Sequence, residues 1–416
     1  MPELSARVLA QGIIAPGAAD TDELARLIAG GPGAGPTRID RFPVAGGRCD
    51  RAFQTDARLR EPGRARRAVE RLAAHAGALT GCTFHVDADP LDHATRMLFA
   101  CCDQVENGLG GPLPQLLGDR VGIFLGTCSA HVPSAGHLLT HTVRDTDDRS
   151  VRILLGIPEY TGILAKLYLG WEPDDPVSAH VTTTGCSASL DAIGRAAAAL
   201  ASGRVTHALA GGMDVVNEPL LRGFEALQSM TNAACRPYDT ARQGFQLGEG
   251  AGLVLLGAAV PGRGGPGVSA FGTGLDGYRL TVPHPDGAGL RMALNRAVDQ
   301  AGAPPGGVIG HGAAVPGNDE TELGAYAAEL SPDTPVTSLK SLFGHSLGAA
   351  GAHNVLAGLQ ALRLGALPGI RNLENPLKTP LRLSADPMPL RGPSVAVCSP
   401  AFGGNNAVLV LGTTGS

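Results

Sequence analysis

Residues 181–189 read Val-Thr-Thr-Thr-Gly-Cys-Ser-Ala-Ser, a β-like run that turns at Gly185 and opens directly into an alanine-rich helical segment. Cys186 is therefore predicted at the amino end of a helix. The first-turn N–H groups of a helix carry partial positive charge, so a thiol placed there ionises more easily and attacks as the thiolate. We expect Cys186 to be the nucleophile and the other seven of the 8 cysteines to be structural.

Apolar strand-like runs alternate with alanine-rich helices along the chain, which is the pattern of a mixed α/β fold. After the nucleophile, the sequence predicts a helix over 187–203 and a buried strand over 205–212. The order then repeats, with a strand at 335–338, a turn holding Gly344 and His345, a small-residue helix at 346–364 and a strand at 394–398. Cys186 and His345 occupy equivalent places in this repeat, which predicts a duplicated fold with one site where the halves meet.

We place the boundary between the halves near the turn-rich stretch Pro-Gly-Arg-Gly-Gly-Pro-Gly at 261–267. Residues 1–260 would form the half with the nucleophilic cysteine, and residues 261–416 the half with two histidines, His311 and His345. The alternative, an exposed loop inside one domain, fits this stretch equally well.

Composition excludes several classes of protein. A formal net charge of −5 and 17% charged residues describe an ordinary surface, so we expect neither nucleic acid nor an anionic membrane as a partner. The chain contains no apolar run of about 18 residues and no basic segment leading into an apolar one at its start. The cysteines show neither metal-ligand spacing nor a disulfide framework. We therefore expect a cytoplasmic protein without a metal.

Several motifs follow one another in the order found in one known family. They are Thr184 to Ser189, Cys235 to Asp239, Gly248 to Gly252, His311-Gly312 with Asn318-Asp319, Lys340 to Gly351, Asn372 to Pro376, and Phe402 to Gly404. In this order the chain resembles the β-ketoacyl synthase (ketosynthase) family of the thiolase superfamily, as an atypical member. The resemblance covers most of the chain and is weakest before about residue 120. It implies a thiolase-like duplicated five-layer αβαβα fold.

The resemblance also implies roles for the motif residues. Cys186 would hold an acyl group as a thioester, and the backbone N–H groups of Cys186 and Phe402 would form an oxyanion hole. His311 and His345 would stabilise the enolate of a malonyl-type extender. Phe402, followed by Gly403 and Gly404, would be the gating aromatic. Lys340 would orient this region through a carboxylate, for which Glu322 is the candidate.

The sequence departs from the family pattern at several positions. Two threonines whose hydroxyls bind the phosphopantetheine arm in the family are here Ala313 and Val315. The usual glutamate beyond the histidine helix is Asn354, an aspartate is Gln243, and a Phe-Gly pair is Pro400-Ala401. Each lost neutral hydrogen bond is worth roughly 0.5–1.5 kcal/mol, so binding of a carrier arm would be weakened. Cys186 and both histidines are retained, which argues for altered substrate handling in a working enzyme.

We therefore expect an acyltransferase of the β-ketoacyl synthase type that forms a carbon–carbon bond in polyketide or other specialised biosynthesis. The alternatives are acyl transfer, release or cyclisation without decarboxylation, and, less favoured, a non-catalytic partner subunit. No cofactor is expected beyond the phosphopantetheine of an acyl carrier protein. We expect a homodimer, with a heterodimer with a related subunit as the alternative.

Two further segments carry expectations. Residues 127–160 would cover the acyl pocket and part of the dimer contact, as in the resembled family. The arginine-rich stretch 58–67 is either a basic landing patch for an acidic carrier protein or the solvated start of a helix.

Overall fold

The computed structural model describes residues 4–42, 44, 49–55, 62–86, 91–129, 154, 157–260, 262 and 264–414. Within these ranges, ten strands form one continuous sheet, in the order β10-β9-β13-β14-β8-β1-β7-β6-β4-β5. The strands of its first five-stranded part are β1 (Ala6–Ile14), β7 (Gly250–Ala258), β6 (His207–Asp214), β4 (Val121–Gly126) and β5 (Ser178–Thr182). Those of the second part are β8 (Gly265–Leu275), β14 (Asn405–Thr414), β13 (Val395–Pro400), β9 (Val308–Ile309) and β10 (Val336–Thr337).

The two parts of the sheet repeat one pattern of strand directions. In the first part β1, β7 and β6 pair antiparallel, and β4 and β5 then add in parallel. In the second part β8, β14 and β13 pair antiparallel, and β9 and β10 add in parallel. Only a short pairing of β1 with β8 joins the parts. The duplication predicted from the sequence is thus present in the strand topology.

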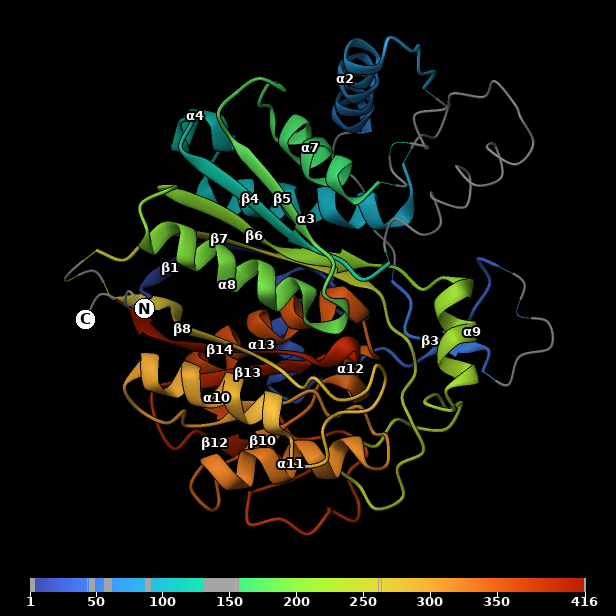
Figure 1. Cartoon of the computed structure of the whole chain (residues 1–416), viewed down its shortest axis with the longest axis vertical. Coiled ribbons are helices and arrows are strands. Elements are labelled where there is room, and N and C mark those ends of the chain that lie inside the picture. The colour runs from blue at the N-terminus through green and yellow to red at the C-terminus, as the bar shows by residue number, and fades with distance from the viewer. Residues whose placement is uncertain are drawn as a thin grey trace.

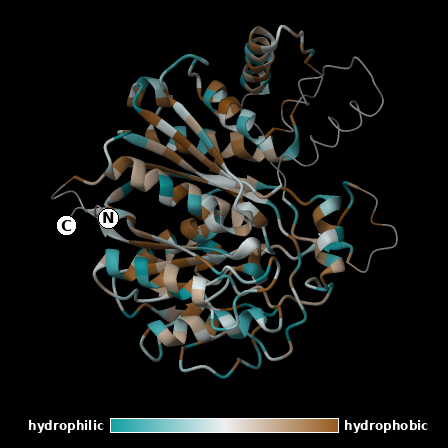
Figure 2. Ribbon diagram, viewed as in Figure 1, coloured by the Kyte–Doolittle hydropathy of each residue, from teal (hydrophilic) through white to brown (hydrophobic). Residues whose placement is uncertain are grey.

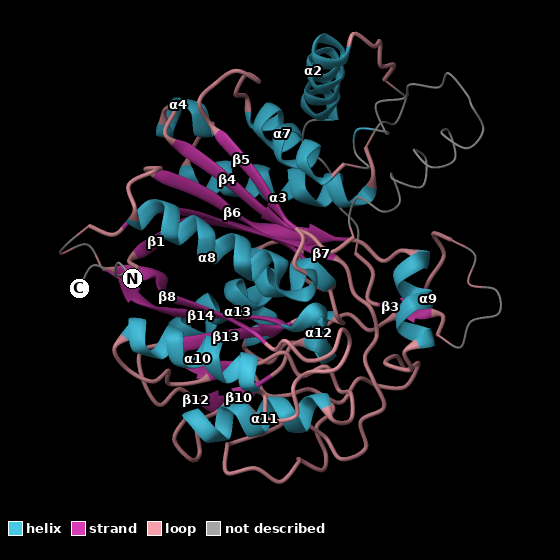
Figure 3. Cartoon of the chain, viewed as in Figure 1, coloured by secondary structure: helices cyan, strands magenta, loops and turns pink. Residues whose placement is uncertain are grey.

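Helices occupy three layers around the two parts of the sheet (Figures 1 and 3). The central layer between them holds α8 (Ala188–Ala201) and α13 (Ala350–Leu364). One outer layer contains α2 (Pro62–Thr80), α3 (His93–Leu109), α4 (Leu113–Leu117) and α7 (Pro158–Leu169). The other contains α10 (Ala288–Ala301) and α11 (Asn318–Glu329). This is the predicted five-layer αβαβα arrangement.

Smaller elements complete the described part of the chain. They are α1 (Thr21–Ile28), α9 (Glu218–Ala226), α12 (Lys340–Phe343), the strand pairs β2 (Thr37–Arg38) with β3 (Arg51–Ala52) and β11 (Ala366–Leu367) with β12 (Met388–Pro389), and the 3₁₀ turns η1 (Gly185–Ser187), η2 (Leu347–Ala349) and η3 (Phe402–Gly404).

The apolar core follows the layers. Separate clusters of buried side chains fill the space between α2, α3, α7 and the first part of the sheet, around α8 and α13 between the two parts, and between the second part and α10 and α11. Figure 2 shows brown and white strands inside and teal patches on the outer helices. The central helix α8 lies very close to β4 at Gly126. A Cβ atom on Gly126 would lie only 2.2 Å from the backbone carbonyl carbon of Ala188, so only glycine fits there.

The predicted elements lie within a few residues of the observed ones. The helix expected at 187–203 is η1 followed by α8, with Gly203 in the left-handed conformation just beyond its end (φ +68°). Residues 265–267 of the stretch where we placed the boundary already belong to β8, and the division of the chain after residue 260 stays a prediction. None of the described helices has the length and apolar character needed to cross a membrane.

Cys186 and His345 were predicted at equivalent places in the two halves. Each does lie near the 3₁₀ turn before a central helix, but the two residues do not occupy the same position relative to that turn. Cys186 is the middle residue of η1, whereas His345 lies two residues before η2. The residue of η2 that corresponds to Cys186 is Gly348. Hydrophobic periodicity reveals the central helices but not the 3₁₀ turns before them, which explains the offset of three residues.

Candidate active site

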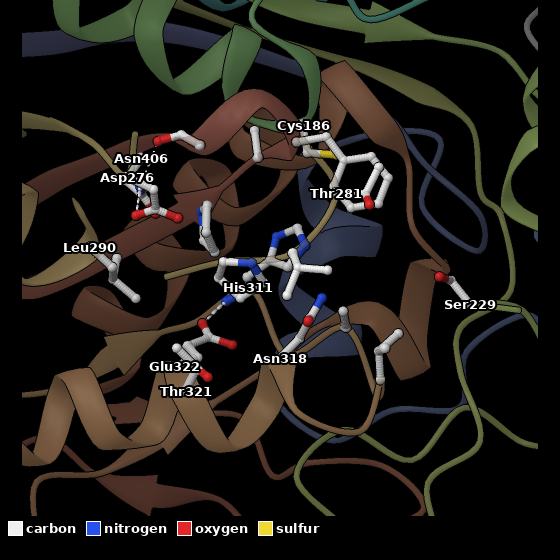
Figure 4. A pocket seen from close by; sticks show the side chains of 18 of the residues that line it. Cys186, Ser229, Asp276, Thr281, Leu290, His311, Asn318, Thr321, Glu322 and Asn406 are labelled. Atoms are coloured by element: carbon white, nitrogen blue, oxygen red, sulfur yellow. Dashed lines mark hydrogen bonds between the residues drawn. The ribbon is translucent and has the colours of Figure 1, made fainter. Parts of the chain in front are cut away.

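A pocket with about 800 Å³ of empty space, open solvent at its mouth included, brings the predicted site residues together. Cys186, His311, His345 and Phe402 all line it, although they come from both halves of the chain. Figure 4 shows Cys186 above His311, with Glu322 on the far side of His311.

The local fold of the nucleophile turn depends on Gly185 and on a buried carboxylate. Gly185 has φ +66°, a left-handed conformation that a residue without a side chain adopts most easily. In the first turn of α8, Asp191 accepts hydrogen bonds from the hydroxyl of Ser187 (2.9 Å) and the amide of Asn405 (2.8 Å). Ser399 donates to the carbonyl oxygen of Cys186 at 2.9 Å. Strands of the second half therefore hold the turn in place.

Cys186 and His345 form a direct pair, with 3.2 Å between Sγ and Nε2. The backbone N–H of Leu347 donates to Nδ1 of His345, also at 3.2 Å. Burial, together with the nearby Lys340, holds the pKa of His345 well below its usual range, so the ring is neutral. A neutral imidazole that accepts at Nδ1 carries its proton on Nε2. His345 therefore donates a hydrogen bond to the sulfur.

The expected lowering of the Cys186 pKa is wrong for the free protein. Burial raises the pKa of this thiol to about 11, and the positive charge of Lys340 offsets only part of that rise. The sequence revealed the helix end but not how completely the sulfur is removed from water. Desolvation disfavours the charged form of any thiol, and here it outweighs the favourable charges.

His311 stands next to His345, with ring centroids 5.1 Å apart and the planes nearly perpendicular. Nζ of Lys340 lies 2.6 Å from the carbonyl oxygen of His311 and 3.3 Å from its Nδ1. Burial and the charge of Lys340 keep the pKa of His311 well below its usual range. Because Lys340 donates to Nδ1, the ring proton lies on Nε2. Both histidines are thus neutral hydrogen-bond donors.

Lys340 contacts His311 directly, and no ion pair within 4.0 Å joins Lys340 to Glu322 among the described residues. The charge of Glu322 still acts on Lys340, where it opposes the lowering of the pKa by burial, so the route through Glu322 stays a prediction. Glu322 itself accepts the backbone N–H groups of His311 (2.5 Å) and Gly312 (2.8 Å) and the hydroxyl of Tyr326 (2.7 Å). One face of the His311 turn is held by a lysine and the other by a carboxylate.

Phe402 begins η3 at the mouth of the pocket, where 37% of its surface is exposed. Its ring centroid lies 5.7 Å from that of Phe224. Gly403 and Gly404 follow with φ of +83° and +79°. A side chain on Gly185 would lie 3.9 Å from the carbonyl oxygen of Phe402, so η1 and η3 are neighbours. Roles in gating and in an oxyanion hole stay predictions.

Asn354 is not among the residues that line the pocket. It is buried in α13, and no hydrogen bond connects it to Cys186, His311 or His345 within the described part of the chain. The neighbouring His353, also in α13, makes polar contacts to the hydroxyl of Ser346 (2.9 Å) and to the carbonyl oxygen of Ile14 (3.2 Å).

Ala313 and Val315, the positions where the family's threonines are missing, both line the pocket. They pack with Phe224, Phe245 and Leu347 in one apolar cluster. The pocket wall next to His311 is therefore apolar at both positions. Thr281 and Asn318 add polar groups elsewhere along the pocket, as Figure 4 shows.

Sequence reasoning missed the two aromatic residues that flank His345. The ring centroid of Phe245 lies 5.0 Å from that of His345 and meets it edge-on, while Phe224 lies at 6.4 Å. Phe245 lies two residues after Gln243, the position where the family's usual aspartate is replaced, so its place in the sequence was a usable signal. Phe224 lies in an ordinary helix, α9, and carries no such signal.

The arginine-rich stretch is a paired, solvated helix start in its described part. Arg64 contacts Glu106 at 2.7 Å and Asp103 at 3.6 Å, and Arg66 contacts Glu70 at 3.0 Å. None of α2 lines the pocket, and this helix lies at the top of Figure 1. Arg58 and Arg60, and most of the segment 127–160, lie outside the described residues. Within the described ranges, no group of histidine, cysteine and acidic residues is arranged to hold a metal ion.

Comparisons with known proteins agree along most of the chain. The profile of the β-ketoacyl synthase N-terminal domain matches residues 7–259, and that of the C-terminal domain matches residues 267–374. The tetracenomycin polyketide synthase ketoacyl synthase alpha subunit of Streptomyces glaucescens is 29% identical over 320 residues, 70% of this chain and 73% of that protein. The chloroplastic 3-oxoacyl-[acyl-carrier-protein] synthase II of Arabidopsis thaliana is 34% identical over 263 residues, 58% of this chain and 48% of that protein.

A solved structure described as the ishigamide ketosynthase/chain length factor is similar along nearly the whole length. It has a TM-score of 0.83 and 26% identity, with 99% of each chain covered. The layers and the strand order described above are thus those of a thiolase-like ketosynthase fold.

Proposed function

Because the chain belongs to the β-ketoacyl synthase family, we propose that it forms a covalent acyl-cysteine at Cys186 from a carrier-bound thioester and then makes a carbon–carbon bond. The condensation is of the Claisen type, in polyketide or other specialised biosynthesis. One observation carries the proposal: the Cys186 sulfur lies 3.2 Å from a neutral histidine donor, with a second neutral histidine in the same pocket.

In the first half-reaction the sulfur of Cys186 attacks the carbonyl carbon of the acyl thioester. A new C–S bond forms, the C–S bond to the carrier breaks, and the carrier leaves as its thiol after taking up the proton of Cys186. His345 keeps its Nε2–H directed at the sulfur and so stabilises the developing thiolate. The backbone N–H groups of Cys186 and Phe402 would stabilise the tetrahedral oxyanion.

In the second half-reaction a malonyl-type thioester loses its carboxylate as carbon dioxide. The electron pair of that C–C bond forms an enolate, whose oxygen accepts hydrogen bonds from the Nε2–H groups of His311 and His345. The enolate carbon then attacks the acyl carbonyl and releases the Cys186 thiolate. Neutral donors suit this step, since Lys340 and Glu322 hold His311 without protonating it.

The apolar pair Ala313 and Val315 supports a second candidate, in which the acyl-cysteine forms but the next step is acyl transfer, release or cyclisation without decarboxylation. Neither side chain can hydrogen-bond a pantetheine arm. A reaction within the bound acyl chain needs no such contact, because effective concentration replaces the lost binding. A purely non-catalytic role is disfavoured by the retained Cys186, His311 and His345.

Labelled malonyl-carrier thioester separates the candidates. If the condensing reaction is correct, carbon dioxide is released and a chain-extended β-keto product appears with preloaded acyl enzyme. If acyl loading proceeds while carbon dioxide release stays near the uncatalysed rate, the second candidate replaces the first. A Cys186→Ala variant provides the background for loading.

We further propose an acyl carrier protein as the substrate carrier and a dimer as the working form. The relatives described above include a carrier-dependent synthase by name and a ketosynthase/chain length factor structure. In the described part of the sheet, β5 is an edge strand directly before the nucleophile turn, with residues only half buried. A second copy can add to this edge in a homodimer, and a related subunit can do so in a heterodimer.

A further inference from the structure

A buried carboxylate at the end of β6 touches both halves of the chain beside the pocket. Asp214 is fully buried. Its Oδ2 accepts the backbone N–H groups of Cys128 and Gly348, each at 2.7 Å. Its Oδ1 accepts the backbone N–H and the hydroxyl of Ser129, each at 2.9 Å. The first half supplies Cys128 and Ser129 after β4, and the second half supplies Gly348 within η2.

The η2 turn held by this carboxylate is strained. Leu347 has φ +53°, a left-handed conformation that a residue with a branched side chain avoids. Such a residue keeps its conformation only where its surroundings fix it. The N–H of Leu347 points to Nδ1 of His345, and the next N–H along the chain, that of Gly348, points to Asp214.

Packing places Gly348 of η2 directly against the carboxylate, with no space for a side chain at that position. A side chain on Gly348 would lie 2.4 Å from the backbone nitrogen of Cys128 and 2.7 Å from Oδ2 of Asp214. Burial raises the pKa of Asp214 to about 6, although four hydrogen bonds oppose that rise, so the group is ionised at neutral pH. An ionised carboxylate offers only acceptors, and every surrounding group is a donor, including the hydroxyl of Thr127 at 3.4 Å from Oδ1.

We propose that Asp214 is a positioning residue for the nucleophile pair. By holding the Gly348 N–H it keeps the Leu347 N–H on Nδ1 of His345, and this contact keeps the His345 proton on Nε2, facing the Cys186 sulfur. The consequence for acyl transfer rests on the proposed function, whereas the consequence for the His345 tautomer does not.

The Asp214→Ala variant tests the proposal. It removes both carboxylate oxygens, so the Gly348 N–H loses its acceptor and η2 is no longer held. In protein labelled with ¹⁵N-histidine, long-range ¹H–¹⁵N spectra should show only the Nε2–H form of His345 in the wild type and a mixture of both forms in the variant. A His345→Asn sample assigns the signal. Acyl loading of Cys186 should fall about tenfold, the size expected for losing one charge-assisted contact.

Two matched variants separate this effect from general loss of structure. Ser129→Ala removes one partner of Asp214 but keeps the Gly348 contact, so His345 should retain the Nε2–H form. Asp103→Asn alters another buried carboxylate, which accepts the hydroxyl of Tyr168 at 2.7 Å in the outer layer, and it too should leave the tautomer unchanged.

The proposal is overturned if wild-type His345 carries its proton on Nδ1. That result needs no variant, so it holds even if D214A misfolds. The proposal is also overturned if D214A keeps the pure Nε2–H form, or if S129A or D103N shows the same mixture as D214A. Absence of acyl loading in the wild type would contradict the proposed function while the tautomer spectra still decide the role of Asp214.

Discussion

At the scale of single residues, the chemistry of Cys186 depends on which of two opposing effects is larger. Burial disfavours the thiolate, while Lys340 and the hydrogen bond from His345 favour it. Burial prevails, and the pKa of the thiol is about 11 in the free protein. The thiol of Cys186 is thus mostly protonated at neutral pH in the free protein.

This balance predicts a steep pH dependence of alkylation. With a pKa of about 11, roughly one thiol in ten thousand is ionised at pH 7, and each further pH unit raises the ionised fraction about tenfold. The rate of iodoacetamide modification of Cys186, followed by peptide mass mapping, should therefore increase about tenfold per unit from pH 7 to 10. A plateau near pH 7 would show that the helix end outweighs burial.

Removing the positive charge beside the nucleophile gives a second prediction. Lys340→Met should slow alkylation of Cys186 at every pH below 10, because Lys340 lowers the pKa of the thiol. It should also reduce turnover more than loading, since the contacts of Lys340 to His311 are lost. Lys378→Met, at an exposed position, is the control. Equal alkylation rates of Cys186 in both variants would show that the charge of Lys340 does not lower the pKa of this thiol.

The apolar wall next to His311 gives a third prediction. Replacing Ala313 and Val315 together by threonine restores two hydroxyls and should raise carbon dioxide release from malonyl-carrier thioester about tenfold, while acyl loading stays the same. Val282→Thr adds a hydroxyl elsewhere on the pocket and should have no such effect. If the double variant releases no more carbon dioxide than the wild type, the missing hydroxyls do not limit the reaction.

At the scale of elements, the buried Glu249, directly before β7, connects Arg41 and Thr55 to the body of the protein. Its carboxylate accepts hydrogen bonds from the guanidinium of Arg41 and from the backbone N–H of Thr55 at 2.9 Å. Nε2 of His93 lies 3.2 Å from the same carboxylate. Burial alone would raise the pKa of Glu249, but the hydrogen bond from His93 and the charge of Arg41 lower it below its usual range. The ionised form therefore stabilises the folded state.

Glu249→Gln should destabilise the protein by about 2 kcal/mol, since a partly exposed arginine and a backbone donor lose a charged partner. Because the folded pKa is depressed, the contribution is fully present above the usual glutamate range near pH 4.3 and is lost as the pH falls below it. Urea unfolding at pH 7 and pH 3.5 measures this, and the difference between wild type and variant should be smaller at pH 3.5 than at pH 7. An equal difference at both pH values would exclude the charge as the cause.

The elements also show how far sequence reasoning reaches. The sequence around Cys186 and His345 predicted α8, α13 and the duplicated order of elements, because a long helix leaves a periodic pattern of apolar residues that can be recognised without the tertiary structure. Burial of the sulfur and the two direct contacts of Lys340 to His311 were not predictable, since they depend on side chains that are distant in sequence and on 3₁₀ turns without a periodic signal. The role of Asp214 was not predictable for the same reason, since the backbone groups that it accepts belong to residues 128 and 348, far away in the sequence.

At the scale of the whole molecule, the pocket exists only because two half-chains with the same strand order place their central helices side by side. The edge strand β5 lies immediately before the nucleophile turn, so assembly through this edge would couple a partner to the site. Light scattering at micromolar concentration should give twice the 42.3 kDa of the chain. A mass of one chain in isolation, with recovery of the doubled mass only on adding a related subunit, would favour the heterodimer.

The central claim is that Cys186 carries the acyl group. Intact mass measured after incubation with an acyl-carrier thioester tests it most directly, followed by peptide mapping and compared with the Cys186→Ala variant. The account predicts one acyl adduct on the peptide that contains Cys186, and none in the variant. An unmodified Cys186, or an adduct that persists in the variant on another cysteine, would contradict it.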